Sequence, residues 1–248
     1  MKLLPVILFL FTLEARAQIV NTETQRMQSD TTGWMGTIGT SFSYAKNVQE
    51  VLDVSLLAHV QYKTRKDLWL FLANYDYLRG NAETLSNNVF FHLRYNHKLT
   101  PALRWELFTQ LQKNAVTGID ARWLLGTGPR LKIAESEKLK MYVGVDAMYE
   151  YEREHSIPVV LHYDIRNSDY LSFTYTPVHP LEIINTFFYQ PLFKKLSDFR
   201  LLDELRIDVK VGKHFSFLTS LAYLYDSFPA ASLPRVNYTL SNGLDYAF

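Results

Sequence analysis

The chain has 248 residues, and its 26 Lys and Arg against 25 Asp and Glu give a formal net charge of +1 at pH 7. This balance provides no electrostatic attraction for nucleic acid, which is excluded as an expected partner. Aromatic residues make up 15% of the chain, yet no apolar run approaches the roughly 20 residues of a membrane-spanning helix. Because the chain has no cysteine, disulfide bonds do not stabilise it.

The chain begins with the pattern of a secretory signal peptide, residues 1–17. Lys2 supplies the positive start, residues 3–13 form the apolar core, and a small-x-small cleavage site ends at Ala17. This pattern predicts Sec export with cleavage near Ala17, into the periplasm of a Gram-negative cell. Residues 18–32 are polar and show no alternation, so we expect a flexible periplasmic leader there.

From residue 33 to residue 248, the sequence breaks into segments of alternating apolar and polar side chains. Segments of about ten residues can cross a membrane as tilted strands with one face toward lipid. The sequence therefore predicts an all-β fold, a transmembrane antiparallel up-and-down β-barrel of 12 strands. Which face of the ninth strand points inward stays open, because that strand is nearly all apolar. The expected strands are 34–45, 51–62, 68–77, 88–98, 103–112, 121–132, 140–151, 166–175, 182–190, 200–211, 216–226 and 238–248.

The last predicted strand alternates clearly and ends on an aromatic residue. A terminal strand of this kind would leave a sticky edge on a soluble protein. In a membrane barrel, closure removes the edge and lipid accepts the apolar face. We therefore expect this strand to close the barrel. We also expect Tyr246 and Phe248 to form the signal that the barrel-assembly machinery reads.

The connections between the predicted strands follow the pattern of bacterial barrels, which have short periplasmic turns and longer outer loops. Residues 126–129, Gly-Thr-Gly-Pro, predict a bulge or bend because proline cannot donate to the strand ladder. The two glycines also leave space for the inner side chains of neighbouring strands. The longer outer loops are expected at 78–87, 152–165, 191–199 and 227–237.

Charged residues of both signs fall on inward positions of the expected strands. Opposite charges can pair across a narrow lumen, provided that they are well hydrogen-bonded. One interpretation is a structural network of salt bridges that fills the lumen, and another is a charged constriction that selects small solutes. The expected lumen charge network consists of Asp53, Arg94, Arg104, Glu106, Arg122, Arg130, Asp146, Glu150, Arg166, Glu204, Arg206, Asp208 and Lys210.

The common signatures of an enzyme are missing from the sequence. It has no cysteine, no Gly-x-Ser-x-Gly elbow and no His-Glu-x-x-His helix. His162 with Asp164 is the one candidate dyad, and no ligand spacing supports a metal site that adds His155 to this pair. We therefore expect no catalytic residues, no metal and no cofactor.

Short motifs spread over most of the mature chain form a set that is shared with a known family. They are LGTGPR at 125–130, YEYE at 149–152, RNSDY at 166–170, NTFFYQP at 185–191, DFR at 198–200 and YDS at 225–227. With these motifs the chain resembles the YdiY-like salt-induced outer-membrane proteins, the DUF481 family of unknown function. The resemblance implies an outer-membrane barrel and supplies no catalytic residues.

The expected function is that of a non-enzymatic integral outer-membrane β-barrel with a mixed-charge lumen. Such a barrel serves either as a narrow pore or in a structural or accessory role. Two alternatives stay open, an outer-membrane hydrolase that acts on lipid or peptide at the outer rim and a barrel whose outer loops bind a partner. The expected partners are outer-membrane lipid, the barrel-assembly machinery and another outer-membrane protein.

Overall fold

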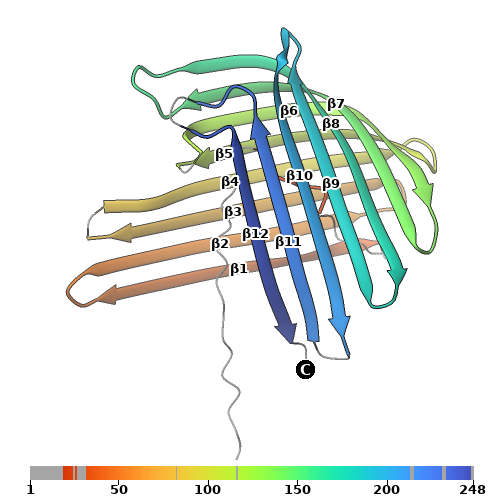
Figure 1. Ribbon diagram of the computed structural model, residues 1–248, viewed down its shortest axis with the longest axis horizontal. Coiled ribbons are helices and arrows are strands. Elements are labelled where there is room, and N and C mark those ends of the chain that lie inside the picture. Colours follow the sequence, from red (N-terminus) through yellow and green to blue (C-terminus); the bar gives the residue numbers. More distant parts are fainter. Residues whose placement is uncertain are drawn as a thin grey trace, which may run out of the picture.

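The computed structural model describes residues 19–24, 26, 32–81, 83–115, 117–212, 215–230 and 233–246. Within these ranges, twelve antiparallel strands form one sheet in sequence order, and each strand pairs with the next (Figure 1). This arrangement confirms the prediction of an all-β fold with twelve strands in up-and-down order. The expected signal peptide, residues 1–17, and Phe248 lie outside the described residues.

The strands are β1 (Gly33–Lys46), β2 (Glu50–Lys63), β3 (Asp67–Gly80), β4 (Glu83–Lys98), β5 (Leu103–Asn114), β6 (Ile119–Glu135), β7 (Leu139–Glu154), β8 (Leu161–Val178), β9 (Leu181–Leu192), β10 (Lys195–Val211), β11 (Phe215–Asp226) and β12 (Val236–Tyr246). Every predicted strand overlaps an observed one. Alternation places one face of each strand inside the curved sheet and the other outside. In β4, for example, Arg94 is 3% exposed whereas the adjacent Leu93 is 40% exposed.

The structure settles which face of β9 points inward. Thr186, Phe188 and Gln190 are buried on the inner face, whereas Phe187 between them is exposed. The interpretation of this strand as nearly all apolar was wrong, because Glu182, Thr186 and Gln190 share the inward parity. The inner face is distinguished by what it packs against, since Phe188 belongs to an interior apolar cluster.

The outer connections are shorter than predicted, because the strands continue beyond the alternating segments. β3 and β4 are separated only by residues 81–82, so the loop expected at 78–87 is mostly strand. The loops expected at 152–165 and 191–199 shrink to 155–160 and 193–194, whereas residues 227–235 do connect β11 to β12. Backbone pairing needs no apolar face, so the hydrophobic pattern marks only part of each strand.

The glycines near the middle of the sheet make room for aromatic rings. The predicted bulge at residues 126–129 is not formed, because β6 keeps one register with each neighbour across them. The space that glycines leave beside neighbouring strands is nevertheless occupied by aromatic side chains. A side-chain carbon on Gly126 would overlap the ring of Phe108, and one on Gly144 would overlap the ring of Tyr170.

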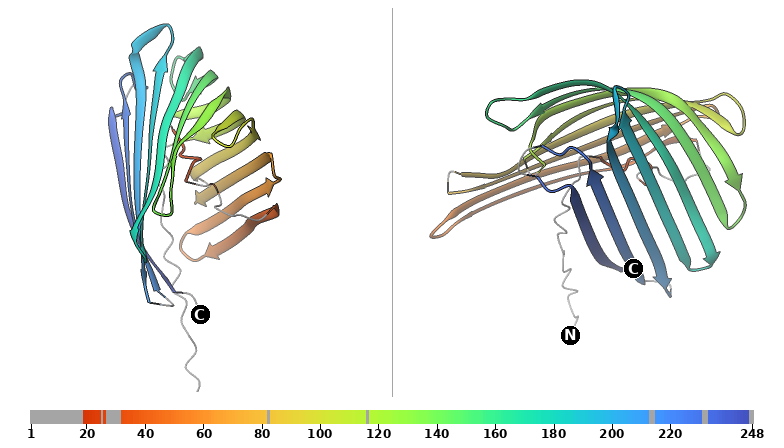
Figure 2. Two further views of the ribbon diagram at one scale, coloured as in Figure 1. Left: turned by 90° about the vertical axis from the view of Figure 1, so that its right-hand side faces the viewer. Right: turned by 45° about the horizontal axis from the view of Figure 1, so that its top comes forward.

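The sheet curls until its first and last strands face one another across the interior, as the left panel of Figure 2 shows. In the described part of the chain, no ladder joins β1 to β12. The predicted closure of the barrel by the terminal strand is therefore not formed here. Residues near the N-terminus lie between the two halves of the sheet (Figure 2) and pack against an apolar cluster on each.

The described residues include no helix that is long and apolar enough to span a membrane.

Candidate functional site: an ion network inside the sheet

A short stretch near the N-terminus, residues 19–24 and 26, lies inside the curved sheet, and we call it the lumen segment. Ile19 packs against an apolar cluster on β8 to β11, and Val20 packs against a second cluster on β3 and β4. The Asn21 Oδ1 atom accepts the backbone N–H of Glu23 at 3.0 Å, a turn that directs Glu23 into the interior. This placement differs from the expected flexible leader at 18–32, because the apolar pair and Glu23 find partners inside the sheet.

The carboxylate of Glu23 is buried among three guanidinium groups. Arg94 Nη1 donates to Oε1 at 2.6 Å, and Arg26 Nε donates to the same oxygen at 2.9 Å. Arg130 Nη1 donates to the other oxygen, Oε2. Arg94 also holds the lumen segment directly, since its Nη2 donates to Thr22 Oγ1 at 2.9 Å. Each carboxylate oxygen of Glu23 therefore has an arginine of the sheet as its partner.

The charge of Glu23 is maintained by these neighbours. Burial alone would raise the pKa of the carboxyl, but the positive charges of Arg130, Arg26 and Arg94 outweigh it. Together they hold the pKa of Glu23 well below its ordinary value of 4.5. Glu23 is therefore ionised at neutral pH despite its burial.

A second carboxylate, that of Glu106, is fully buried beside the first. Tyr170 Oη donates to Oε2 at 2.7 Å and Arg26 Nη2 donates to Oε1 at 2.6 Å, while Asn96 Nδ2 also donates to Oε1. Arg130 Nη1 in turn donates to Tyr170 Oη at 2.9 Å. A buried carboxylate is tolerated when it is paired and hydrogen-bonded in this way.

A further ion network lies on the inner face of β6 to β11, around Glu150. Its carboxylate accepts hydrogen bonds from Arg122 Nε at 2.6 Å, Arg166 Nε at 2.8 Å and Arg200 Nη1 at 2.7 Å. Two of these arginines, Arg166 and Arg200, also pair with further acidic residues of the network. They are Glu152 and Asp226 beside Arg200, at 3.4 and 3.2 Å, and Asp198 beside Arg166, at 3.0 Å.

The structure brings together only part of the charge network expected from the sequence. Asp146 is buried close to Gly128, and Asp53 and Lys210 are exposed. Arg206 pairs with Asp208 on the same strand, at 3.0 Å, and both are partly exposed, as are Arg104 and Glu204. Six of the expected residues belong to one or the other of the two networks. They are Arg94, Glu106, Arg122, Arg130, Glu150 and Arg166.

Several members of the networks were not in the expected set. They are Glu23, Arg26, Glu152, Asp198, Arg200 and Asp226. Glu152 and Arg200 have the same inward parity as their strand neighbours Glu150 and Arg206, so alternation alone could have found them. Glu23 and Arg26 lie in a segment without alternation, which offers no comparable signal.

Two of the histidines, His155 and His162, contact acidic side chains near the ends of strands. His162 Nε2 contacts Glu154 Oε1 at 2.7 Å, so the contact made by this ring is not the one expected with Asp164. His155 Nδ1 contacts Asp120 Oδ1 at 2.9 Å. Ligand atoms of Glu152, Glu154 and His162 lie within 4.8 Å of one another, but Glu152 is already paired with arginine.

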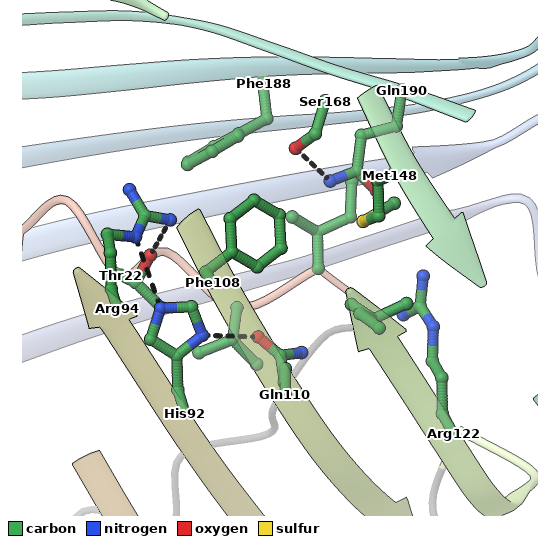
Figure 3. A pocket seen from close by; sticks show the side chains of 13 residues that line it. Thr22, His92, Arg94, Phe108, Gln110, Arg122, Met148, Ser168, Phe188 and Gln190 are labelled. Atoms are coloured by element: carbon green, nitrogen blue, oxygen red, sulfur yellow. Dashed lines mark hydrogen bonds between the residues drawn. The ribbon is translucent and has the colours of Figure 1, made fainter. Parts of the chain in front are cut away.

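A small cavity of mixed polarity adjoins Arg94, and Figure 3 shows the side chains that line it. Within it, Arg94 Nε donates to His92 Nε2 at 3.3 Å, and His92 Nδ1 lies 3.1 Å from Gln110 Oε1 (Figure 3). The His92 ring is thus neutral, with its proton on Nδ1. This chain of contacts fixes the orientation of Arg94 from the side of the sheet.

Comparison with solved structures finds similar chains at low sequence identity. The NanC porin is 10% identical with a TM-score of 0.49, and the match covers 80% of this chain and 94% of that one. The KdgM porin is 10% identical with a TM-score of 0.44, covering 84% and 98%. The translocator domain of autotransporter NalP from Neisseria meningitidis is 10% identical with a TM-score of 0.46, covering 92% of each chain.

A search of curated proteins finds no significant match. The family model described as "Protein of unknown function, DUF481" matches residues 37–248, which is most of the chain. The resemblance inferred from the short motifs is thereby confirmed, and the chain belongs to the DUF481 family.

Proposed function

We propose that the protein is an integral outer-membrane β-barrel and that its interior is a narrow, non-enzymatic pore closed by the lumen segment. The outward side chains support a lipid-facing surface, since Trp34 is 77%, Ile38 70% and Phe42 73% exposed. The inward face of the same sheet buries the charged networks. Apolar residues outside and charged residues inside are typical of a membrane barrel and the reverse of a soluble domain.

The observation that carries closure of the pore is the docking of Glu23 inside the sheet. The carboxylate is held by Arg94 at 2.6 Å and by Arg130, and Ile19 and Val20 cover apolar residues on both halves of the sheet. A segment held at three places across the interior obstructs passage of solutes. Its release would open a path lined by the remaining charged side chains.

In a bilayer, we propose that β1 and β12 pair with each other. Unpaired backbone N–H and C=O groups cost several kcal/mol each in hydrocarbon, so an open sheet edge is unstable there. Export by a signal peptide cleaved near Ala17, and recognition of Tyr246 and Phe248 by the barrel-assembly machinery, belong to the same proposal. Outer-membrane lipid is then the main partner of the outward face.

The absence of cysteine makes this pairing easy to test. Cysteine pairs that combine Thr40→Cys in β1 with Ser241→Cys, Asn242→Cys or Gly243→Cys in β12 are oxidised in outer-membrane preparations. We expect one of them to form a disulfide. Ser41→Cys with Ser55→Cys is the matched control, because these hydroxyl oxygens are already 2.8 Å apart. A disulfide in the control but in none of the β1–β12 pairs would contradict the inserted barrel.

Solute flux tests closure of the pore. Liposomes that contain the refolded chain are placed in a hypertonic solution of a small sugar, and their swelling is followed by light scattering. We expect slow swelling with the wild type and fast swelling with Glu23→Gln, which removes the charge that Arg94 and Arg130 hold. Equal, fast swelling of both would show that the lumen segment does not close the pore.

A further inference from the structure

The interior presents two apolar surfaces beside the arginine pair. Leu68, Leu70, Leu72 and Phe90 form one surface on β3 and β4. Tyr170, Phe188, Leu202 and Leu224 form the other on β8 to β11. A pore for hydrophilic solutes needs no inward apolar surface, because the lumen of such barrels is polar.

The lumen segment carries side chains that complement both the apolar surfaces and the arginine pair. Ile19 packs on the apolar cluster of β8 to β11, and Val20 packs on that of β3 and β4. Glu23, a few residues later, places one carboxylate oxygen on Arg94 and the other on Arg130. The segment thus occupies the interior as an apolar body followed by a carboxylate.

Besides their contacts with the lumen segment, each of the two arginines has partners on the sheet. Arg94 is oriented by His92 at 3.3 Å. Arg130 donates to Tyr170 Oη at 2.9 Å, and its guanidinium lies 4.1 Å from the centre of the Tyr142 ring. A pair of guanidinium groups that is oriented in advance binds a carboxylate with little loss of side-chain entropy.

We propose that Arg94 and Arg130, with the adjoining apolar surfaces, form a binding site for a carboxylate that carries an apolar body. Ile19, Val20 and Glu23 occupy this site in the closed protein, and the ligand displaces them. The inference rests on the proposed function, because it names the class of ligand that competes with the closing segment. Neutral apolar molecules lack the group that the arginines bind, and small carboxylates lack the apolar body.

The test uses the full mature chain in lipid nanodiscs and trypsin as the reporter. Arg26 is held in the docked segment by Glu23 and Glu106, at 2.9 and 2.6 Å, so cleavage after Arg26 reports displacement. We expect hexanoate to accelerate this cleavage by about tenfold at saturation. Hexanamide and acetate serve as the neutral and the short matched compounds, and neither should accelerate it. Equal acceleration by hexanamide overturns the role of the carboxylate, and equal acceleration by acetate overturns the apolar part.

Direct binding provides the second measurement. Calorimetric titration with hexanoate should give an affinity at least about tenfold higher for Glu23→Gln than for the wild type, because the internal competitor loses its charge-assisted hydrogen bonds. Glu137→Gln, in an exposed turn, should bind like the wild type. Equal affinity of all three proteins overturns the proposal. Slow swelling of Glu23→Gln liposomes together with tight hexanoate binding would refute only the pore and leave the site in place.

Discussion

Glu23→Gln removes the charge that fastens the lumen segment and keeps the shape of the side chain. Loss of one partner of a buried ion pair costs about 3–5 kcal/mol. Glu106 compensates in part, since it already lies 3.4 Å from Arg94 and 3.9 Å from Arg130. We therefore expect the lower end, about 3 kcal/mol. Because 1.4 kcal/mol corresponds to a factor of ten, docking of the segment should weaken by about 100-fold.

Limited trypsin cleavage after Arg26 measures this change. When docking is fast relative to cleavage, the rate follows the undocked fraction, so Glu23→Gln should be cleaved about 100-fold faster than the wild type. Glu137→Gln is the control for loss of a carboxylate elsewhere, and circular dichroism checks that the strands are intact. A cleavage rate for Glu23→Gln within about threefold of the wild type would refute this prediction, because it corresponds to a change of less than about 1 kcal/mol in the free energy of docking.

Three further predictions concern the same interior. Gly144→Ala should lower the free energy of unfolding in urea by about 1–3 kcal/mol, because its side chain meets the Tyr170 ring, whereas Gly39→Ala meets nothing and should have little effect. Tyr170→Phe should cost about 1–3 kcal/mol by removing a buried hydroxyl with two hydrogen bonds, and the exposed Tyr163→Phe should cost much less. Acidification from about pH 7 to 5 should not open the pore in conductance recordings, since a lowered pKa keeps the Glu23 contact present above the ordinary value of 4.5 and loses it only in stronger acid. Opening within that range would contradict the ion-pair account of docking.

Alternation of polarity predicts the strands well because each strand has two different surroundings. Arg94 and Leu93 are adjacent in β4, and the first faces the interior while the second is exposed. In β9 the polar Thr186 and Gln190 share the inward parity of Phe188, so the sequence did carry a signal for the inner face, which the packing of Phe188 in an interior cluster confirms. The predicted outer loops were too long for a related reason, since strand pairing continues where apolar side chains end.

The contact of Glu23 with the two arginines could not be predicted from the alternation of polar and apolar residues. Glu23 lies in a segment without periodicity, and its partners Arg94 and Arg130 are distant in sequence. Inward parity identified the two arginines as lumen residues. It could not distinguish them from Lys210, which has the same parity but is exposed near the end of β10. Position along the strand and the entry of the N-terminal residues decide which charges are buried together.

Single-channel conductance recorded before and after trypsin cleavage of the same membrane tests the central claim most directly. The intact chain should show little or no discrete current, because the lumen segment occupies the interior. Cleavage after Arg26, verified by mass spectrometry, should produce stable openings, which added hexanoate then reduces. Stable openings of the intact chain that cleavage leaves unchanged would contradict a pore closed by its own N-terminal residues.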